Sequence, residues 1–230
     1  MIRSIIFDID GTLVDHRSAQ EKGLATFFDT ALSGSIPDYG HFREVWISSV
    51  APFFDLYKKG GISFEELRGK RMQYVLSEFG IARTFEEALG LFHSYLSHYE
   101  SHYAVYDDVV ACLRSLSKYA LGIISNGDSE MQRRKLSLTG IDTYFTTVMI
   151  SEDIGVAKPH KEIFQKTLEA MGARPFESVY VGDDHGADIV GADAAGMKTA
   201  YLMRYGEPPS DIASLNLRDL EGFDEKVRTI

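Results

Sequence analysis

Two aspartates stand at the end of an apolar run near the N-terminus. Asp8 and Asp10 follow the residues SIIF, and Gly11 and Thr12 come directly after them. Because residues two apart on a strand face the same side, the Asp8 and Asp10 carboxylates are expected on one side of the strand. Gly11 lets the chain turn directly after them. Carboxylates are costly to bury, but they can transfer protons and bind hard cations. The spacing therefore indicates either chemistry or an ordinary turn rich in Asp and Gly.

Three later β-rich runs are also followed by polar residues. These are Ser125, Asn126 and Gly127 after LGII, Lys158 in the loop after TTVMI, and Asp183, Asp184 and Asp188 after VYV. Taken singly, each group is explained by a turn, a helix start or a solvated lysine. In open parallel sheets, however, ligands bind at the carboxyl ends of the strands. Four such ends in this order predict an active site made of acids, small hydrogen-bond donors and one lysine.

The elements that must position these residues are short strands that alternate with helices. Strands are expected at 119–125, 144–150, 177–183 and 197–203, and helices at 107–118, 129–139, 160–172, 186–196 and 218–228. This alternation predicts βαβ units and a parallel sheet. The N-terminal run SIIFDID is almost continuously apolar, as a strand buried on both faces should be, so it belongs to the same sheet.

A helical region separates the first strand from the others. Apolar residues recur at three- and four-residue spacing in the segments 18–32, 41–60, 63–80 and 84–102. Ser63 with Glu66, and Thr84 with Glu87, have the spacing of capping boxes at helix starts. The region therefore reads as a set of helices that interrupts the sheet after its first strand.

The expected fold class is α/β, with a Rossmann-like parallel sheet core flanked by helices and an inserted all-helical domain. Residues 1–14 and 103–230 are expected to form the core, and residues 15–102 the helical insertion. A chain of 230 residues is long enough for one large core and one smaller domain.

Composition limits the classes of partner. The net charge is −10 and the sequence pI is about 5.2. An acidic chain is not suited to non-specific binding of nucleic acid or of anionic membranes. No apolar run is long enough to span a membrane, and Asp8 interrupts the N-terminal run too early for a signal peptide, so we expect a cytoplasmic protein. The single cysteine, Cys112, cannot form an intrachain disulfide and lies in a helical pattern typical of a core residue.

The four polar segments together resemble the four motifs of the haloacid dehalogenase (HAD) superfamily of aspartate-nucleophile phosphotransferases. DIDGT resembles the first motif, SNG the second, KP the third and GDDHGAD the fourth. The helical insertion stands where that family has a helical cap domain. The segment ISEDIGVAKPHKEIF is most similar to the pyrimidine 5′-nucleotidase group of phosphatases. The resemblance implies a HAD-like catalytic core.

The resemblance also implies catalytic roles. Asp8 would be the nucleophile that attacks phosphorus and forms an aspartyl-phosphate. Asp10 would protonate the leaving oxygen and then act as general base toward the hydrolytic water. Lys158 would offset the repulsion between the Asp8 carboxylate and the phosphate.

Further residues would bind substrate and metal. Thr12 would help hold the turn, while Ser125 and the backbone N–H groups around Asn126 and Gly127 would donate to phosphoryl oxygens. Oxygen ligands suit Mg²⁺, and they would come from Asp8, the backbone carbonyl of Asp10, and Asp183. Asp188 would orient Lys158 or a metal-bound water, and Asp184 is expected to be a solvated loop residue.

The expected function is a Mg²⁺-dependent phosphomonoester hydrolase for a small phosphorylated metabolite, either a nucleotide or a sugar phosphate, working as a monomer or homodimer. Three alternatives stay open. A phosphomutase would keep both aspartates of the first motif. A 2-haloacid dehalogenase would lack the second aspartate and need no metal, so Asp10 and Asp183 argue against it. A non-catalytic phosphate-binding regulator is expected to have lost a catalytic residue, and none is missing.

Overall fold

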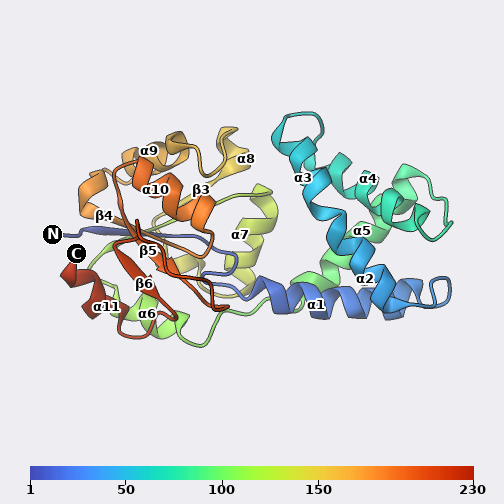
Figure 1. The fold of residues 1–230 in the computed structure, drawn as a ribbon, viewed down its shortest axis with the longest axis horizontal. Coiled ribbons are helices and arrows are strands. Elements are labelled where there is room, and N and C mark those ends of the chain that lie inside the picture. The colour runs from blue at the N-terminus through green and yellow to red at the C-terminus, as the bar shows by residue number, and fades with distance from the viewer. The chain divides into compact units, whose positions relative to one another are not determined.

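The computed structural model describes residues 1–230, except for the side chain of Lys58. It divides into two compact units (Figure 1). The first comprises Met1–His16 with Tyr103–Ile230, and the second comprises Arg17–His102. Among the described residues, no helix is both long enough and apolar enough to cross a lipid bilayer.

The first unit is built on a six-stranded sheet with the strand order β3-β2-β1-β4-β5-β6. The strands are β1 (Ser4–Phe7), β2 (Ala120–Ser125), β3 (Thr147–Ile150), β4 (Ser178–Gly182), β5 (Lys198–Leu202) and β6 (Leu215–Leu217). Every neighbouring pair is parallel. The predicted α/β fold class with a Rossmann-like parallel sheet is therefore confirmed.

Helices cover both faces of this sheet. They are α6 (Val109–Ser115), α7 (Ser129–Leu138), α8 (Ser151–Ile154), α9 (Lys161–Ala170), α10 (Gly191–Ala194) and α11 (Phe223–Lys226), with a π-helical turn η4 (His185–Val190) and short 3₁₀ turns η2 (Asp142–Tyr144), η3 (Pro175–Glu177) and η5 (Val227–Thr229). Ile5 and Phe7 belong to a core cluster with side chains of α6 and α11. Ile6 and Tyr180 face the opposite side and pack with side chains of α9. The alternation explains why the strands are apolar without interruption.

The C-terminal end of the chain departs from the prediction. The helix expected at 218–228 begins only at Phe223, and the preceding residues Leu215–Leu217 form the edge strand β6. Three residues are too few to show a strand pattern by themselves. Their backbone groups are satisfied by β5, in the register Ala200 to Leu215, so long-range pairing decides this element. The helix expected at 186–196 is also divided, into η4 and α10.

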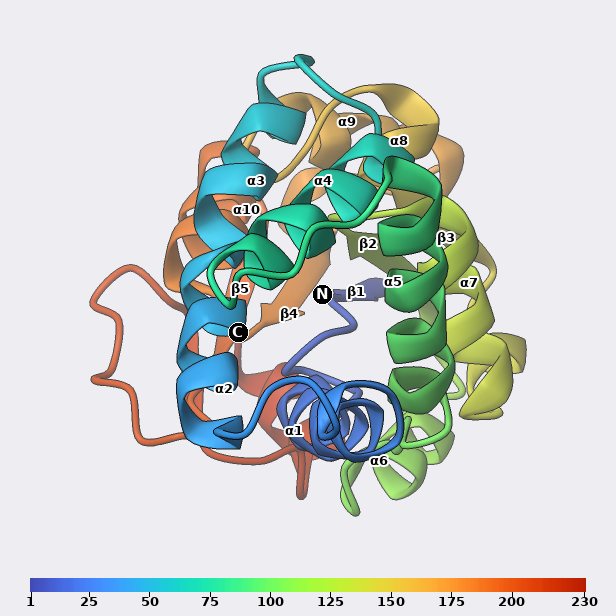
Figure 2. The same cartoon turned by 90° about the vertical axis from the view of Figure 1, so that its right-hand side faces the viewer.

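The second unit consists of helices. They are α1 (His16–Phe27), which enters from the first unit, the π-helical turn η1 (Phe28–Leu32), α2 (Tyr39–Ser48), α3 (Val50–Lys58), α4 (Phe64–Ser77) and α5 (Phe85–Glu100). Figure 2 shows α4 beside α5, the two helices of this unit with the most extensive packing. Both predicted capping boxes are confirmed, at Ser63 with Glu66 and at Thr84 with Glu87.

The segment 41–60 forms two helices rather than one, because α2 ends at Ser48 and α3 begins at Val50. Pro52 has no N–H to donate to the carbonyl of the preceding turn. It therefore fits the first turn of α3 better than the middle of one continuous helix. The hydroxyls of Ser48 and Ser49 donate to the carbonyls of Val45 and Trp46, respectively, at 3.0 and 2.7 Å.

Candidate active site

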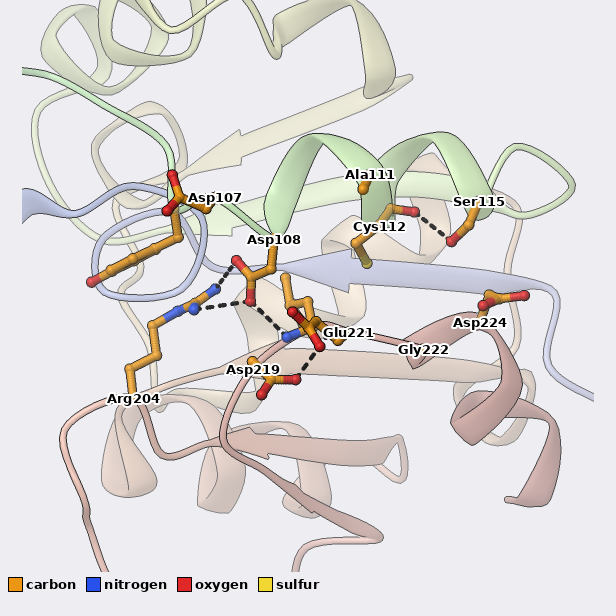
Figure 3. A pocket seen from close by; sticks show the side chains of 12 residues that line it. Asp107, Asp108, Ala111, Cys112, Ser115, Arg204, Asp219, Glu221, Gly222 and Asp224 are labelled. Carbon is orange, nitrogen blue, oxygen red and sulfur yellow. Dashed lines mark hydrogen bonds and ion pairs between the residues drawn. The ribbon is translucent and has the colours of Figure 1, made fainter.

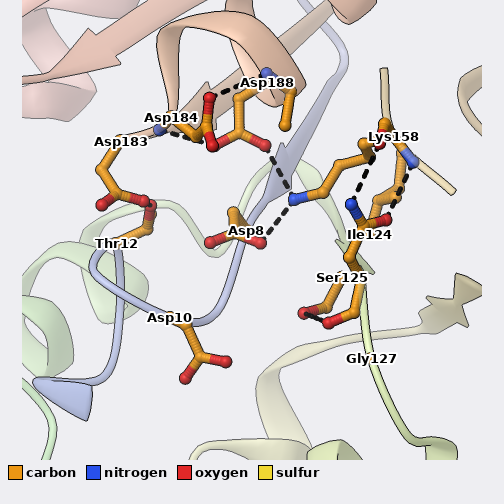
Figure 4. Close-up of polar contacts among 12 residues, drawn as sticks. Asp8, Asp10, Thr12, Ile124, Ser125, Gly127, Lys158, Asp183, Asp184 and Asp188 are labelled. Atoms are coloured by element: carbon orange, nitrogen blue, oxygen red, sulfur yellow. Dashed lines mark hydrogen bonds and ion pairs between the residues drawn. The ribbon is translucent and has the colours of Figure 1, made fainter. Parts of the chain in front are cut away.

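The polar segments gather where the strand order reverses. β1 lies between β2 and β4, and from there the chain order runs outward in both directions. Asp8 follows β1, Ser125 ends β2, and Asp183 follows β4. Their side chains lie at the carboxyl ends of adjacent parallel strands (Figure 4). This switch point is the place where open α/β sheets bind ligands.

Asp8 is buried and paired with Lys158. The Lys158 Nζ donates to Oδ1 of Asp8 at 2.5 Å and to Oδ1 of Asp188 at 2.7 Å. Burial raises the pKa of Asp8 well above its usual range, against the opposing charge of Lys158. Burial also acts to lower the pKa of Lys158, but the charges of Asp188 and Asp8 outweigh it and raise that pKa well above its usual value. Lys158 is therefore a fixed cation between two carboxylates.

Tyr180 also contacts Lys158, although its place in the sequence did not predict a site residue. Its hydroxyl accepts a hydrogen bond from Lys158 Nζ at 3.0 Å and donates to the carbonyl of Ile124 at 3.0 Å. The ring packs at right angles to Phe164 in the core. In sequence it looks like one more aromatic residue of a buried strand, and only its contacts reveal its place beside Lys158.

Asp183 lies against the loop that carries the first motif. Its Oδ1 accepts a hydrogen bond from the Thr12 hydroxyl at 3.3 Å. Gly11 has a φ of +83°, and a Cβ at that position would stand 2.1 Å from Oδ2 of Asp183. Glycine is therefore required there both for the turn and for this close approach. Burial, together with the charge of Asp188, raises the pKa of Asp183 to about 7.

Three carboxylates form a cluster that could hold a metal ion. Oxygens of Asp8, Asp183 and Asp188 can all lie within 4.8 Å of one another. Only Lys158 pairs with them directly among the described residues, so three acids share one cation. Burial is the main cause of the raised pKa of Asp183, and the charge of Asp188 adds to it. A hard divalent cation with oxygen ligands would offset this excess of negative charge. The residues present therefore fit a divalent metal.

Asp10 is directed away from this cluster. Its Oδ1 accepts from Lys135 Nζ at 2.5 Å and its Oδ2 accepts from Gln132 Nε2 at 2.8 Å. Figure 4 shows its carboxylate pointing away from Asp8. Burial acts to raise the pKa of Asp10, but the charges of Lys135 and His16 and the two hydrogen bonds lower it overall. The side chain is thus held as a carboxylate outside the metal cluster.

Gln132 and Lys135 were not predicted as site residues. Both are buried on α7, together with Leu136 on the same face. Lys135 Nζ also donates to Oε1 of Gln132 at 2.7 Å. A signal was present in the sequence: the face of this helix that carries Leu136 also carries a glutamine and a lysine at a spacing of three. Two polar residues on the buried face of a helix need partners inside the protein.

The second motif holds the third in place. The Asn126 side chain accepts from the backbone N–H of Lys158 at 2.8 Å and donates to its carbonyl at 3.1 Å. The Ser125 hydroxyl accepts from Gln132 Nε2 at 2.9 Å. The backbone N–H of Gly127 donates to the Ser151 hydroxyl at 3.0 Å, so a phosphoryl oxygen would compete for that donor. The Asn126 side chain therefore positions Lys158.

The acidic residues after β4 differ from one another. Asp184 is exposed in the loop after β4, as expected, and its Oδ1 accepts from the Ala187 N–H at 2.8 Å and caps η4. The Asp184 N–H in turn donates to Oδ2 of Asp188 at 3.0 Å. Asp188 is buried and contacts Lys158 through its other oxygen.

Arg204 supports the first-motif loop through the backbone carbonyl of Thr12. Its Nη2 and Nε donate to the Thr12 carbonyl at 2.8 and 3.2 Å. Asp108 holds the same guanidinium through two hydrogen bonds of 3.1 Å (Figure 3). The Tyr106 ring lies 3.8 Å from the guanidinium carbon. These contacts connect the start of α6 to the loop that carries Asp8 and Asp10.

Comparison with known proteins agrees with this geometry. The sequence model of the haloacid dehalogenase-like hydrolase family matches residues 2–196. Glyceraldehyde 3-phosphate phosphatase of Pyrococcus abyssi is 30% identical over 211 residues, which are 90% of this chain and 83% of that protein. Pyrophosphatase PpaX of Bacillus cereus is 29% identical over 203 residues, which are 87% of this chain and 83% of that protein.

A solved structure shares the fold. The crystal structure of YfnB from Bacillus subtilis, bound to magnesium, has a TM-score of 0.81 to this chain at 24% identity. The match covers 98% of each chain.

Proposed function

The chain belongs to the haloacid dehalogenase-like hydrolases and is a phosphatase of that family, and from this we propose that it is a Mg²⁺-dependent phosphomonoester hydrolase that works through an aspartyl-phosphate. The observation that carries the proposal is the position of Asp8. It lies at the switch point of the sheet, within hydrogen-bond distance of Lys158 and beside the carboxylates of Asp183 and Asp188.

Asp8 attacks the phosphorus atom in the first step. Lys158 contacts Oδ1 of Asp8, and Oδ2 has no hydrogen bond among the described residues. A new bond forms between the carboxylate and phosphorus while the bond to the ester oxygen breaks. The charge of Lys158 offsets the repulsion between the carboxylate and the phosphate.

Asp10 moves the protons. In the first step it gives a proton to the departing ester oxygen, and in the second it takes a proton from the water that attacks the aspartyl-phosphate. The second step releases inorganic phosphate and restores Asp8. The observed contacts with Lys135 and Gln132 hold Asp10 ionised, as the second step requires. For the first step, Asp10 must leave Lys135 and carry a proton.

The remaining residues bind the phosphoryl group and the metal. The Ser125 hydroxyl and the backbone N–H of Asn126, at the end of β2, would donate to phosphoryl oxygens. Asp8, Asp183 and the backbone carbonyl of Asp10 would hold Mg²⁺, with Asp188 close enough to serve as a further ligand. The metal, when bound, supplies positive charge that favours the ionised form of Asp8 and neutralises the phosphate.

The substrate class follows from the relatives and from the helical unit. The named relatives act on glyceraldehyde 3-phosphate or on pyrophosphate. We take the substrate of this chain to be a small phosphorylated metabolite, with nucleotides and sugar phosphates included. Residues 17–102 would act as the cap domain that selects the leaving group.

A panel of phosphate compounds tests this proposal. Release of inorganic phosphate is measured for glyceraldehyde 3-phosphate, pyrophosphate, nucleoside monophosphates, sugar phosphates and flavin mononucleotide, each with Mg²⁺ and with EDTA. We expect turnover of at least one ester that depends on Mg²⁺. Turnover of chloroacetate that persists in EDTA would instead identify a dehalogenase. Isomerised sugar phosphate that forms only with a bisphosphate activator, without net phosphate release, would identify a mutase.

A further inference from the structure

The helical unit contains a cavity of its own. Its volume is about 280 Å³, just below the range of about 300–1,000 Å³ that is usual for ligand pockets. Leu24, Trp46, Ile47 and Val50 form apolar walls, and Arg71 brings a guanidinium to the same cavity. All of these residues belong to the unit Arg17–His102.

Arg71 is buried without an anionic partner. The residue is only 7% exposed. Its Nε donates to the Ser49 hydroxyl at 2.8 Å and its Nη2 donates to the Trp46 carbonyl at 2.9 Å, and both acceptors are neutral. Among the side chains that the structure describes, no carboxylate forms an ion pair with it. A guanidinium has five N–H donors, so these two contacts leave the Nη1 edge available.

Aromatic rings surround the same guanidinium. Its central carbon lies 4.2 Å from the centre of the Trp46 ring and 5.8 Å from that of Phe92. Burial lowers the pKa of Arg71 to about 10, which still leaves the side chain charged at neutral pH. Ring contacts offset only part of the cost of burying a cation, and an opposite charge offsets far more.

Glu21, a carboxylate that also lines the cavity, does not supply that charge. It forms an ion pair with Arg43, whose Nε lies 2.9 Å from Oε2 and 3.1 Å from Oε1. Arg17, the other arginine of the lining, has an interaction of its own. The cavity therefore combines apolar walls, a size suited to a small molecule and, at Arg71, a buried cation that lacks an anion.

We propose that this cavity binds a small organic monocarboxylate, whose carboxylate pairs with Arg71 and whose apolar body lies against Trp46 and Leu24. The planar guanidinium fork matches a carboxylate in shape. The apolar walls favour an organic anion over inorganic phosphate, which has no apolar body to place against them. None of the residues at the strand ends lines this cavity.

The chain contains a single tryptophan, so its fluorescence reports on this cavity directly. The experiment titrates the full-length protein with 3-methylbutanoate at constant ionic strength and follows Trp46 emission. The neutral 3-methylbutanamide and inorganic phosphate serve as comparison probes. We expect a saturable change with the carboxylate, at millimolar concentration or below, and none with the amide. No saturable change, an equal response to the amide, or tighter binding of phosphate would overturn the proposal.

Two variants test the role of Arg71. Arg71→Met should weaken carboxylate binding by at least about tenfold, because it removes the ion pair. Val50→Glu should do the same without disturbing the fold. Val50 is 45% exposed and is the first residue of α3, where an acidic side chain favours the helix. Its new carboxylate would compete for the guanidinium.

Leu56→Glu is the matched control for charge. It lies on the same helix, is 47% exposed and does not line the cavity, so binding should be unchanged. If Arg71→Met does not fold, as judged by circular dichroism, the carboxylate affinity of Val50→Glu tests the proposed site instead. Wild-type affinity in Val50→Glu, or an equal loss in Leu56→Glu, would contradict a site at Arg71.

Discussion

Lys135 donates a hydrogen bond of 2.5 Å to Oδ1 of Asp10, as Lys158 does to Oδ1 of Asp8, so each aspartate of the first motif has its own buried lysine. The two lysines come from different elements, since Lys135 lies on α7 and Lys158 precedes α9. Two carboxylates separated by a single residue are thereby held in different directions and different electrostatic settings. This separation gives them a structural basis for different tasks.

Lys135→Met should lower kcat by about 10- to 100-fold, because Asp10 loses the contact that holds it ionised for the second step. The methionine keeps the apolar stem and roughly the same volume, so the buried face of α7 stays filled. Steady-state kinetics on the best phosphate ester from the panel provide the measurement. Lys166→Met removes an exposed lysine of α9 and should leave kcat unchanged. Equal kcat values for the two variants would show that Lys135 has no role in catalysis.

Asp8→Asn should reduce turnover of every phosphate ester by at least about 1,000-fold, because an amide cannot form the aspartyl-phosphate. Lys158 retains its contact with Asp188, so the fold should persist, and thermal unfolding checks this point. Acid-quench trapping of phosphoprotein provides a second readout. Phosphate should be found on the wild-type chain and be absent from the variant. Wild-type activity in this variant would remove Asp8 as the nucleophile.

Asp183→Asn should weaken the binding of Mg²⁺, because it removes one of the proposed carboxylate ligands. Without Mg²⁺, the same change should relieve the repulsion among the three neighbouring carboxylates. In EDTA, the variant should be at least as stable as the wild type, because burial and Asp188 already raise the pKa of Asp183 to about 7. Saturating Mg²⁺ should raise the melting temperature of the wild type by roughly 5–10 °C at 100 times Kd, and that of the variant by less. Asp184→Asn, which preserves the cap of η4, should behave as the wild type. An equal Mg²⁺ response in all three proteins would exclude Asp183 as a ligand.

Cys112 should resist alkylation in the folded protein. Burial, with the charge of Asp108, raises the pKa of its thiol to about 12. Since the thiolate is the nucleophile, only about one thiol in a thousand would be ionised at pH 9. The thiol ionises more easily in the unfolded chain, so its contribution to stability is complete below about pH 8.5 and is lost as pH rises toward 12. Mass spectrometry after iodoacetamide treatment should show labelling only in guanidinium chloride. Rapid labelling of the native protein would contradict the buried position.

Arg204→Met should lower the free energy of unfolding by about 3 kcal/mol, because it leaves Asp108 buried without its cation. Both side chains are less than a tenth exposed, at 8% and 9%. Urea unfolding followed by circular dichroism provides the measurement. Arg228→Met removes an arginine that is 56% exposed and should change the free energy of unfolding by less than about 0.5 kcal/mol. Similar losses in the two variants would mean that Arg204 does not anchor the first-motif loop.

Local sequence patterns predicted the parallel sheet, the polar residues at its edge and two helix starts of this protein. Apolar strands followed by Asp8, Ser125 and Asp183 predicted a parallel sheet with polar residues at one edge, because parallel strands all end on the same side. The capping boxes at Ser63 and Thr84 are local by nature, and the structure has both. Features that depend on contacts within a few residues of chain can be inferred from residue order alone.

Tertiary contacts decided the rest. Asp10 and Lys135 are 125 positions apart in sequence, and no local pattern indicates that they meet. The buried guanidinium of Arg71 and the short strand β6 likewise depend on neighbours from distant segments. Residue order determined which chemistry the chain can carry, because residue types set their charges and donors. The folded structure decided which carboxylate faces which cation, because only packing brings distant side chains within hydrogen-bond distance.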